Sequence, residues 1–260
     1  MDQIACRSLF VSHGSPMLAL SQHPSAKFLR ELGSRIAKPR AAIVISPHWQ
    51  AHSFAVKSAP RYEAWHDFGG FPQELYSLQY SPAGDASLAD RVADAIDLAH
   101  LPTGRVEETR IDHGVWMPLK MMWPQADVPL VQVAVGPGGA PAAWQLGEAL
   151  TPLLGDGTIL IASGSPTHNL RTIKQESAPP AGWAVAFDDW LAAHIVARNE
   201  EALIHYRRSA PHAVEAHPTD EHLLPIFAAA AVGTEADGPV QTLHRGFTHG
   251  TLSMASYAFP

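Results

Sequence analysis

Residues 8–16 read SLFVSHGSP, a short apolar run that ends in serine and is followed at once by His13, Gly14 and Pro16. Two other segments repeat the arrangement: AAIVISPHW at residues 41–49 contains His48, and TILIASGSPTHN at residues 158–169 contains His168. Brief apolar runs bounded by Gly or Pro are typical of buried strands. Ligands of an open parallel sheet bind outside the carboxyl ends of its strands. The three segments therefore predict one crevice into which His13, His48 and His168 point.

Strands and helices are expected to alternate along the chain. The predicted strands cover residues 8–12, 41–46, 129–135 and 158–163, and the predicted helices cover residues 25–37, 85–99, 142–154 and 182–197. This alternation favours an α/β fold with a mostly parallel central sheet covered by helices on both faces. The tail adds two predicted strands, 240–245 and 251–258, around a turn at 248–250. Because the sequence has no repeat or linker, we expect a single catalytic domain over residues 1–260, with its site at the carboxyl ends of the strands.

Composition excludes several classes of partner. The net charge of −7 and the lack of a basic run argue against nucleic acid. No apolar stretch near either end approaches the roughly 20 residues that span a bilayer, so no membrane association is expected. The start of the chain lacks the apolar region of a signal peptide, which predicts a cytoplasmic location. The single cysteine, Cys6, excludes an intrachain disulfide and a thiolate-rich metal site. The oligomeric state stays open.

Histidine is the unusual residue of this chain, with 15 copies against 18 Lys and Arg. Imidazole is the commonest metal ligand and the usual acid/base group near neutral pH. His217 and His222 flank the entry to a helix that is predicted from Pro225 to about residue 232, where Gly233 stops it. His113 lies at a loop-to-helix junction that Asp112 is expected to cap. Six others are expected to be surface or capping residues: His23, His52, His100, His194, His205 and His212.

An aromatic segment, residues 59–82, interrupts the α/β rhythm and is long enough to predict a functional lid or rim. Its aromatic residues, which are expected to form an apolar wall, are Tyr62, Trp65, Phe68, Phe71 and Tyr76. His66 lies on the same segment and is a candidate for lining a pocket, whereas His244 and His249 near the tail strands stay unassigned.

Other catalytic motifs are missing from the sequence. It contains no GxGxxG, no GxxxxGK[ST], no GxSxG and no HExxH. Ser12 and Ser163 at strand ends leave a serine hydrolase open.

Six motifs in order along the chain resemble one enzyme family, the class III extradiol ring-cleavage dioxygenases, in their 4,5-DOPA dioxygenase-like branch. They are HGSPM at His13, SPHW at His48, DFGGFP at residues 67–72, DHGVWMPL at His113, SGSPTHNL at His168 and HPTDEHLLP at residues 217–225. The resemblance implies a non-haem enzyme that inserts O₂ into the ring of a catechol, L-DOPA or a related compound, and gives a ring-opened semialdehyde.

Carried over by motif, the resemblance makes His13 and His48 metal ligands, with a third from the segment of His217 and His222, where His222 is preferred. His168 is implied as the acid/base group, close enough to act as a further ligand, and His113 as a hydrogen-bonding partner of the substrate. One divalent metal is implied, Fe(II) for activity. More distant relatives use a carboxylate as the third ligand. An all-histidine shell carries less negative charge and therefore also suits Zn(II).

Two alternatives share the same histidines: a zinc-dependent hydrolase and a non-catalytic metal-binding relative. Candidates to bind a substrate carboxylate are Arg61, Lys120, Arg171 and Arg245.

Overall fold

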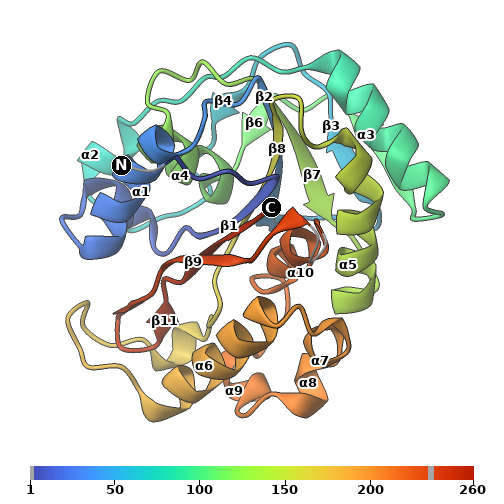
Figure 1. The fold of residues 1–260 in the computed structure, drawn as a ribbon. Helices are drawn as coiled ribbons and strands as arrows, with labels where there is room; N and C mark the ends of the chain where they lie inside the picture. Colours follow the sequence, from blue (N-terminus) through green and yellow to red (C-terminus); the bar gives the residue numbers. More distant parts are fainter. Residues whose placement is uncertain (1–2, 234–236) are drawn as a thin grey trace.

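An eight-stranded sheet forms the centre of the computed structural model, which describes residues 3–233 and 237–260 (Figure 1). The strand order is β5-β3-β7-β2-β8-β1-β12-β9. The strands are β1 (Ser8–Ser12), β2 (Ala41–Gln50), β3 (Phe54–Lys57), β5 (Thr103–Val106), β7 (Leu130–Val135), β8 (Thr158–Gly164), β9 (Gln241–His244) and β12 (Ser256–Phe259).

The four central strands, β7, β2, β8 and β1, run parallel to one another. In register, Ile43 of β2 lies beside Leu160 of β8, and Phe10 of β1 lies beside Ala162. On one side β3 is antiparallel to β7, and on the other β12 is antiparallel to β1. Because the central strands are parallel, their carboxyl ends meet at one edge of the sheet, as the sequence predicted.

Helices cover both faces of the sheet (Figure 1). Successive residues of β2 pack on opposite sides: Ile43 and Ile45 join one buried apolar cluster, and Ala42 and Val44 join the other. A strand buried on both faces has no polar alternation, which explains its continuous apolar sequence. One face carries α3 (Ala86–Leu98), α5 (Gly139–Leu150), α6 (Gly182–Val196) and α10 (Leu224–Ala230), and the other carries α1 (Pro24–Arg35) and α4 (His113–Met122).

The predicted elements agree with these bounds. The four strands predicted before the tail and all five predicted helices, including the one from Pro225, are confirmed within a few residues. The last turn expected of 142–154 is the separate 3₁₀ helix η2 (Thr151–Leu153). Short elements were missed because three to five residues carry no readable period. They include β3, β5, α7 (Glu200–Ile204), α8 (Tyr206–Ser209), α9 (Ala213–Ala216), η1 (Pro16–Leu20) and η3 (Leu170–Thr172).

The tail is more broken than predicted. Strand β9 and the turn at residues 249–251 are present, but the expected strand 251–258 is divided into β11 (Leu252–Ser253) and β12. A short hairpin joins β11 to β10 (Phe247–Thr248). The interruption leaves the buried Ala255 carbonyl free to accept a 2.8 Å hydrogen bond from Ser12 Oγ.

The aromatic segment 59–82 is folded back over the sheet edge that carries the histidines. Its two-residue strand β4 (Glu63–Ala64) pairs with β6 (Arg110–Ile111), directly before α4. A single helical turn, α2 (Gln73–Tyr76), follows. The segment is thereby fixed beside His113.

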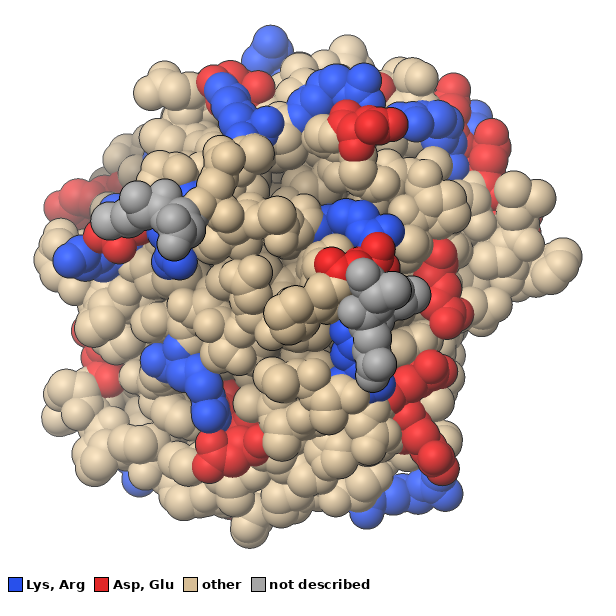
Figure 2. All heavy atoms as spheres, in the orientation of Figure 1, with Lys and Arg blue, Asp and Glu red and all other residues tan. Residues whose placement is uncertain are grey.

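Charged side chains of both signs are interspersed on the face shown in Figure 2, without a basic stripe. Among the described residues, no helix is long and apolar enough to cross a membrane.

Candidate metal centre

Five histidines meet at the carboxyl ends of the central strands. His13 directly follows β1, His48 lies near the end of β2 and His168 lies four residues after β8. His113 is the first residue of α4, and His222 stands two residues before α10. The structure thus brings all five predicted site residues together, from five separate parts of the chain.

The rings are close enough to share one ion. His13 Nε2 and His48 Nε2 are 3.3 Å apart. The ring centroid of His222 is 5.7 Å from that of His13 and 4.9 Å from that of His48. His168 stacks on His222 at 3.4 Å with an interplanar angle of 7°. The ring of His113 lies 4.0 Å from that of His48.

Hydrogen bonds behind the rings fix which nitrogen faces the centre. His13 Nδ1 lies 2.9 Å from Ser163 Oγ, which leaves its Nε2 toward His48. His222 Nδ1 lies 3.1 Å from Glu221 Oε1. A carboxylate partner requires a proton on Nδ1 and leaves a lone pair on Nε2, the form that binds metals.

His113 is held by Asp67 of the aromatic segment. Its backbone N–H and its Nδ1 both bond to Asp67 Oδ1 at 2.9 Å. The other oxygen of Asp67 lies 4.0 Å from His48 Nδ1. This carboxylate therefore orients His113 and lies near His48, a role that no local sequence pattern could reveal.

The predicted capping role of Asp112 is wrong. Its side chain makes no bond to α4 and instead accepts hydrogen bonds from Ser46 Oγ at 2.5 Å and Gln132 Nε2 at 2.6 Å, all three residues being buried. Asp67 supplies the carboxylate at the start of α4. Asp112 thus ties the end of β2, next to His48, to β7.

Burial keeps four of the five histidines uncharged near neutral pH. Desolvation, reinforced by neighbouring histidines, places the pKa values of His13 and His222 well below the usual range. The same burial lowers the pKa values of His48 and His168 to about 4. Neutral imidazole is the ligating form and also a ready proton acceptor.

These residues fit a divalent metal. Candidate ligand atoms lie within 4.8 Å of one another in two groups, His13–His48–His113 and His168–Glu221–His222. His222 Nε2 is buried and has no hydrogen-bond partner among the described residues. A buried polar atom without a partner is costly, and a metal would satisfy it. Imidazole donors suit Fe²⁺ and Zn²⁺ alike, so the donor set supports one ion without selecting the element.

His217, the alternative third ligand, lies outside the cluster. Its Nε2 bonds to the Pro166 carbonyl at 2.8 Å, and its ring packs against Phe187 and Tyr206. The structure thus places His222, and not His217, beside His13 and His48.

His217 gives a prediction about stability. Burial lowers its pKa to about 3, whereas histidine in an unfolded chain titrates near about 6.5. Between these values the unfolded state binds more protons, so the free energy of unfolding decreases as the pH falls. From about pH 7 to about pH 5 this effect amounts to about 2 kcal/mol. We expect His217→Gln to reduce the pH dependence of the free energy of unfolding, measured by urea denaturation, by this amount. An unchanged pH dependence would contradict the assigned burial of His217.

A cavity of about 440 Å³ opens above the five histidines. Two aromatic side chains of the segment 59–82, Phe68 and Phe71, line it as expected. Tyr62 is instead buried with its hydroxyl on the Lys57 carbonyl, and Trp65 stacks with Arg110 outside the cavity. The apolar part of the wall consists of Pro16, Phe68, Phe71, Leu170, Ile173 and Leu252.

Histidines outside the cluster divide into several roles. His66 bonds to the Leu78 carbonyl and packs on Trp116, so it does not line the cavity. His23 caps α1, as predicted. His244 stacks on Phe28. His249, left unassigned by the sequence, lines the cavity and has a positive φ of 55°.

Neither Ser12 nor Ser163, the two serines that left a serine hydrolase open, offers a nucleophile to the cavity. Ser12 Oγ donates to backbone carbonyls, and Ser163 Oγ is buried behind His13. Neither hydroxyl lines the cavity.

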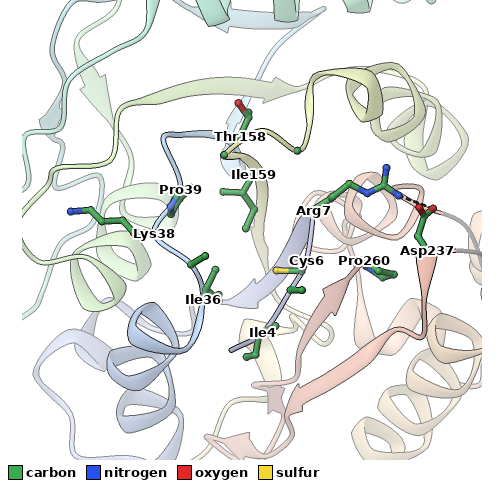
Figure 3. Close-up of a pocket in the computed structure, with 14 residues that line it drawn as sticks. Ile4, Cys6, Arg7, Ile36, Lys38, Pro39, Thr158, Ile159, Asp237 and Pro260 are labelled. Atoms are coloured by element: carbon green, nitrogen blue, oxygen red, sulfur yellow. Dashed lines mark ion pairs between the residues drawn. The ribbon is translucent and has the colours of Figure 1, made fainter. Parts of the chain in front are cut away.

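A second cavity of about 460 Å³ lies at the opposite, amino-terminal edge of the strands (Figure 3). Residues 4–7 before β1, 36–39 before β2 and 155–159 around the start of β8 line it. A 2.7 Å ion pair joins Arg7 to Asp237 on its rim (Figure 3). Among the described residues no histidine lines this cavity, so the histidine cluster lies at the other edge of the sheet.

Histidines that converge at the strand ends of an α/β sheet, below a largely apolar cavity, are typical of a metal-binding enzyme. The family model described as the catalytic LigB subunit of aromatic ring-opening dioxygenase matches residues 7–260. The chain therefore belongs to the LigB family of aromatic ring-opening dioxygenases. The predicted assignment to the extradiol ring-cleavage dioxygenases is confirmed.

Similar proteins agree with this family. The chain is 35% identical over 257 residues to a 4,5-DOPA dioxygenase extradiol of Beta vulgaris, covering 97% of this chain and 96% of that protein. It is 34% identical over 263 residues to a protein of the same name from Escherichia coli K12, covering 98% and 95%. Among solved structures, an uncharacterized protein JW3007 of Escherichia coli K12 matches with a TM-score of 0.80 and 27% identity, over 98% of this chain and 100% of that one.

Proposed function

We propose that this chain opens the ring of a catechol beside its two hydroxyls, using O₂ and one divalent metal held by His13, His48 and His222. The observation that carries the proposal is His222 Nε2, which is buried without a partner beside the close pair of His13 and His48. Fe(II) is the metal proposed for turnover. When bound, it would act as a Lewis acid that lowers the pKa of the catechol hydroxyls and provides a site for O₂.

His168 is proposed as the proton acceptor. Its ring lies over His222 at the floor of the cavity, and burial lowers its pKa to about 4, so the ring is neutral near neutral pH. A neutral imidazole beside the metal site can accept a catechol proton and return it to the opening ring.

His113 is proposed to contact the substrate oxygens. Because Asp67 fixes the proton on His113 Nδ1, Nε2 is left as the group that can meet a ligand. The grouping of His113 with His13 and His48 would also allow it to act as a ligand. We assign the third ligand position to His222, since His222 Nε2 lacks any other partner.

Phe68 and Phe71 are proposed to pack against the catechol ring. Both line the cavity, and the ring of Phe68 lies 5.5 Å from that of His113. Aromatic faces hold a flat substrate and exclude water from the reacting centre.

The proposed activity is tested by loading the protein with Fe(II) under argon and then adding a catechol and air. We expect O₂ uptake equal to the substrate consumed and a yellow ring-opened product. Zn(II)-dependent ester hydrolysis without O₂ would instead favour the alternative that the all-histidine donor set allows.

Gly114 gives a prediction about the metal site. A β-carbon there would lie 2.3 Å from Ser46 Oγ and 2.9 Å from His48 Cδ2, so His48 would have to move. Helix propensity alone would favour alanine by about 1 kcal/mol. We expect Gly114→Ala to weaken metal binding about 10- to 100-fold, measured by competition with a chelator. Gly182→Ala is the matched control, because Gly182 begins α6 with no heavy atom within 4 Å of the added carbon. Equal metal affinity in both variants would contradict the proposal.

A further inference from the structure

The cavity above the histidines offers no full charge to a substrate. Apart from the five clustered histidines, its polar lining consists of Ser15, Ser165 and His249. Within residues 3–233 and 237–260, no Lys, Arg, Asp or Glu lines it. The remaining wall is apolar.

The cations that could have served a substrate carboxylate lie elsewhere. Arg61 donates to the Ser81 carbonyl at 2.8 Å, and Lys120 donates to the Gln79 carbonyl at 3.0 Å. Arg245 is paired with Asp188 and Asp189. Arg171 follows Leu170 in η3, and only Leu170 of the two lines the cavity.

Two apolar side chains at the mouth of this cavity are unusually exposed. Leu170 is 58% and Ile173 46% exposed, although both line the cavity. Covering such surface with an apolar substituent is favourable. A carboxylate or ammonium brought to the same place would lose water and find no opposite charge, which is costly.

We propose that the substrate of this chain is a catechol whose ring substituent is apolar and uncharged, and that Leu170 and Ile173 select it. The inference rests on the proposed ring-opening function. The catechol hydroxyls would face the histidines, and the substituent would lie along Leu170 and Ile173 at the mouth. An amino-acid side chain, such as that of L-DOPA, would be disfavoured.

The test compares substrates that differ in one feature. Catechol, 4-methylcatechol, 4-ethylcatechol and 4-propylcatechol form an apolar series, and 3-(3,4-dihydroxyphenyl)propionate replaces the last methyl group with a carboxylate. We expect kcat/KM to rise about three- to fourfold with each carbon. The propyl compound should exceed the propionate by at least about tenfold, because the carboxylate has no partner.

Binding is measured separately from turnover. Isothermal titration of the zinc-loaded protein should give Kd values in the same order. Higher kcat/KM for the propionate or for L-DOPA than for 4-propylcatechol would overturn the inference while leaving ring opening intact. If no catechol is cleaved, the proposed ring-opening function is wrong. If the titrations also show tighter binding of the charged compounds, the inferred preference for an apolar substituent is wrong as well.

Substitutions at the mouth test the assignment to residues. Leu170→Arg and Ile173→Arg each place a cation where the substituent would lie. We expect the ratio of kcat/KM for propyl over propionate to fall at least about tenfold in each. Leu98→Arg is the matched control, since Leu98 is 79% exposed at the end of α3 and does not line the cavity. An equal change in the control, or none at the mouth, would overturn the assignment.

His249 requires its own control, because its imidazole lies in the cavity wall outside the histidine cluster and could donate a hydrogen bond to a substrate carboxylate. Asparagine tolerates its positive φ and removes the imidazole. We expect His249→Asn to leave the propyl-to-propionate ratio unchanged. A further loss of propionate turnover in this variant would show that this imidazole binds the carboxylate and would contradict the inference.

Discussion

Replacing His222 with alanine is expected to remove the bound metal and, with it, all measurable ring opening. Binding of a structural metal by four ligands is worth about 10–16 kcal/mol, so one ligand contributes about 3–4 kcal/mol. The loss corresponds to about 100- to 1,000-fold weaker binding. Metal content per chain after gel filtration, together with O₂ uptake, measures both effects.

His217→Gln is the control for His222→Ala, since it removes a buried histidine five residues away that bonds to Pro166 and not to the cluster. This control variant should retain its metal and its activity. A metal-free His217→Gln protein beside a metal-replete His222→Ala protein would reverse the assignment of the third ligand.

Replacing His168 with asparagine is expected to separate metal binding from turnover. The ring stacks on His222, and its nitrogens have no hydrogen-bond role that the fold requires among the described contacts. Loss of a general acid/base group typically reduces kcat about 100- to 10,000-fold. Metal content should stay near that of the unchanged protein.

His66→Asn is the matched control for His168→Asn, because His66 lies near the cavity without lining it. Loss of metal from His168→Asn would show that the main role of His168 is to bind the metal. Normal turnover in that variant would exclude it as the proton acceptor.

The strand-end histidines could be predicted because strand and ligand are neighbours in sequence. A continuous apolar run indicates a buried parallel strand, and the direction of the chain shows which end of it is the carboxyl end. His13, His48 and His168 each follow such a run within a few residues. The location of the histidine cluster could therefore be predicted from the sequence.

The choice between His217 and His222 could not be made the same way. Both lie in the irregular segment between α9 and α10, where no period shows which side chain faces inward. The main-chain bond from Ser165 N to the His222 carbonyl ties that segment to the end of β8. This contact depends on residues 57 positions apart along the chain.

The wall of the cavity was only partly predictable. The aromatic segment predicted Phe68 and Phe71, but Leu170, Ile173 and His249 come from a short 3₁₀ helix, the residue after it and a turn, whose sequences carry no pattern of burial. Asp112 was misassigned because an Asp before a helix usually caps it, whereas here long-range bonds to Ser46 and Gln132 outweigh the local one.

The central claim is that three imidazoles, those of His13, His48 and His222, hold one metal ion. An anomalous-diffraction structure of the Fe(II)-loaded protein at the iron edge tests it most directly. We expect a single anomalous peak within about 2.0–2.2 Å of Nε2 of all three residues, with the His168 ring beside it. A peak bonded to His113 in place of His222, or one outside the cluster, would contradict the account.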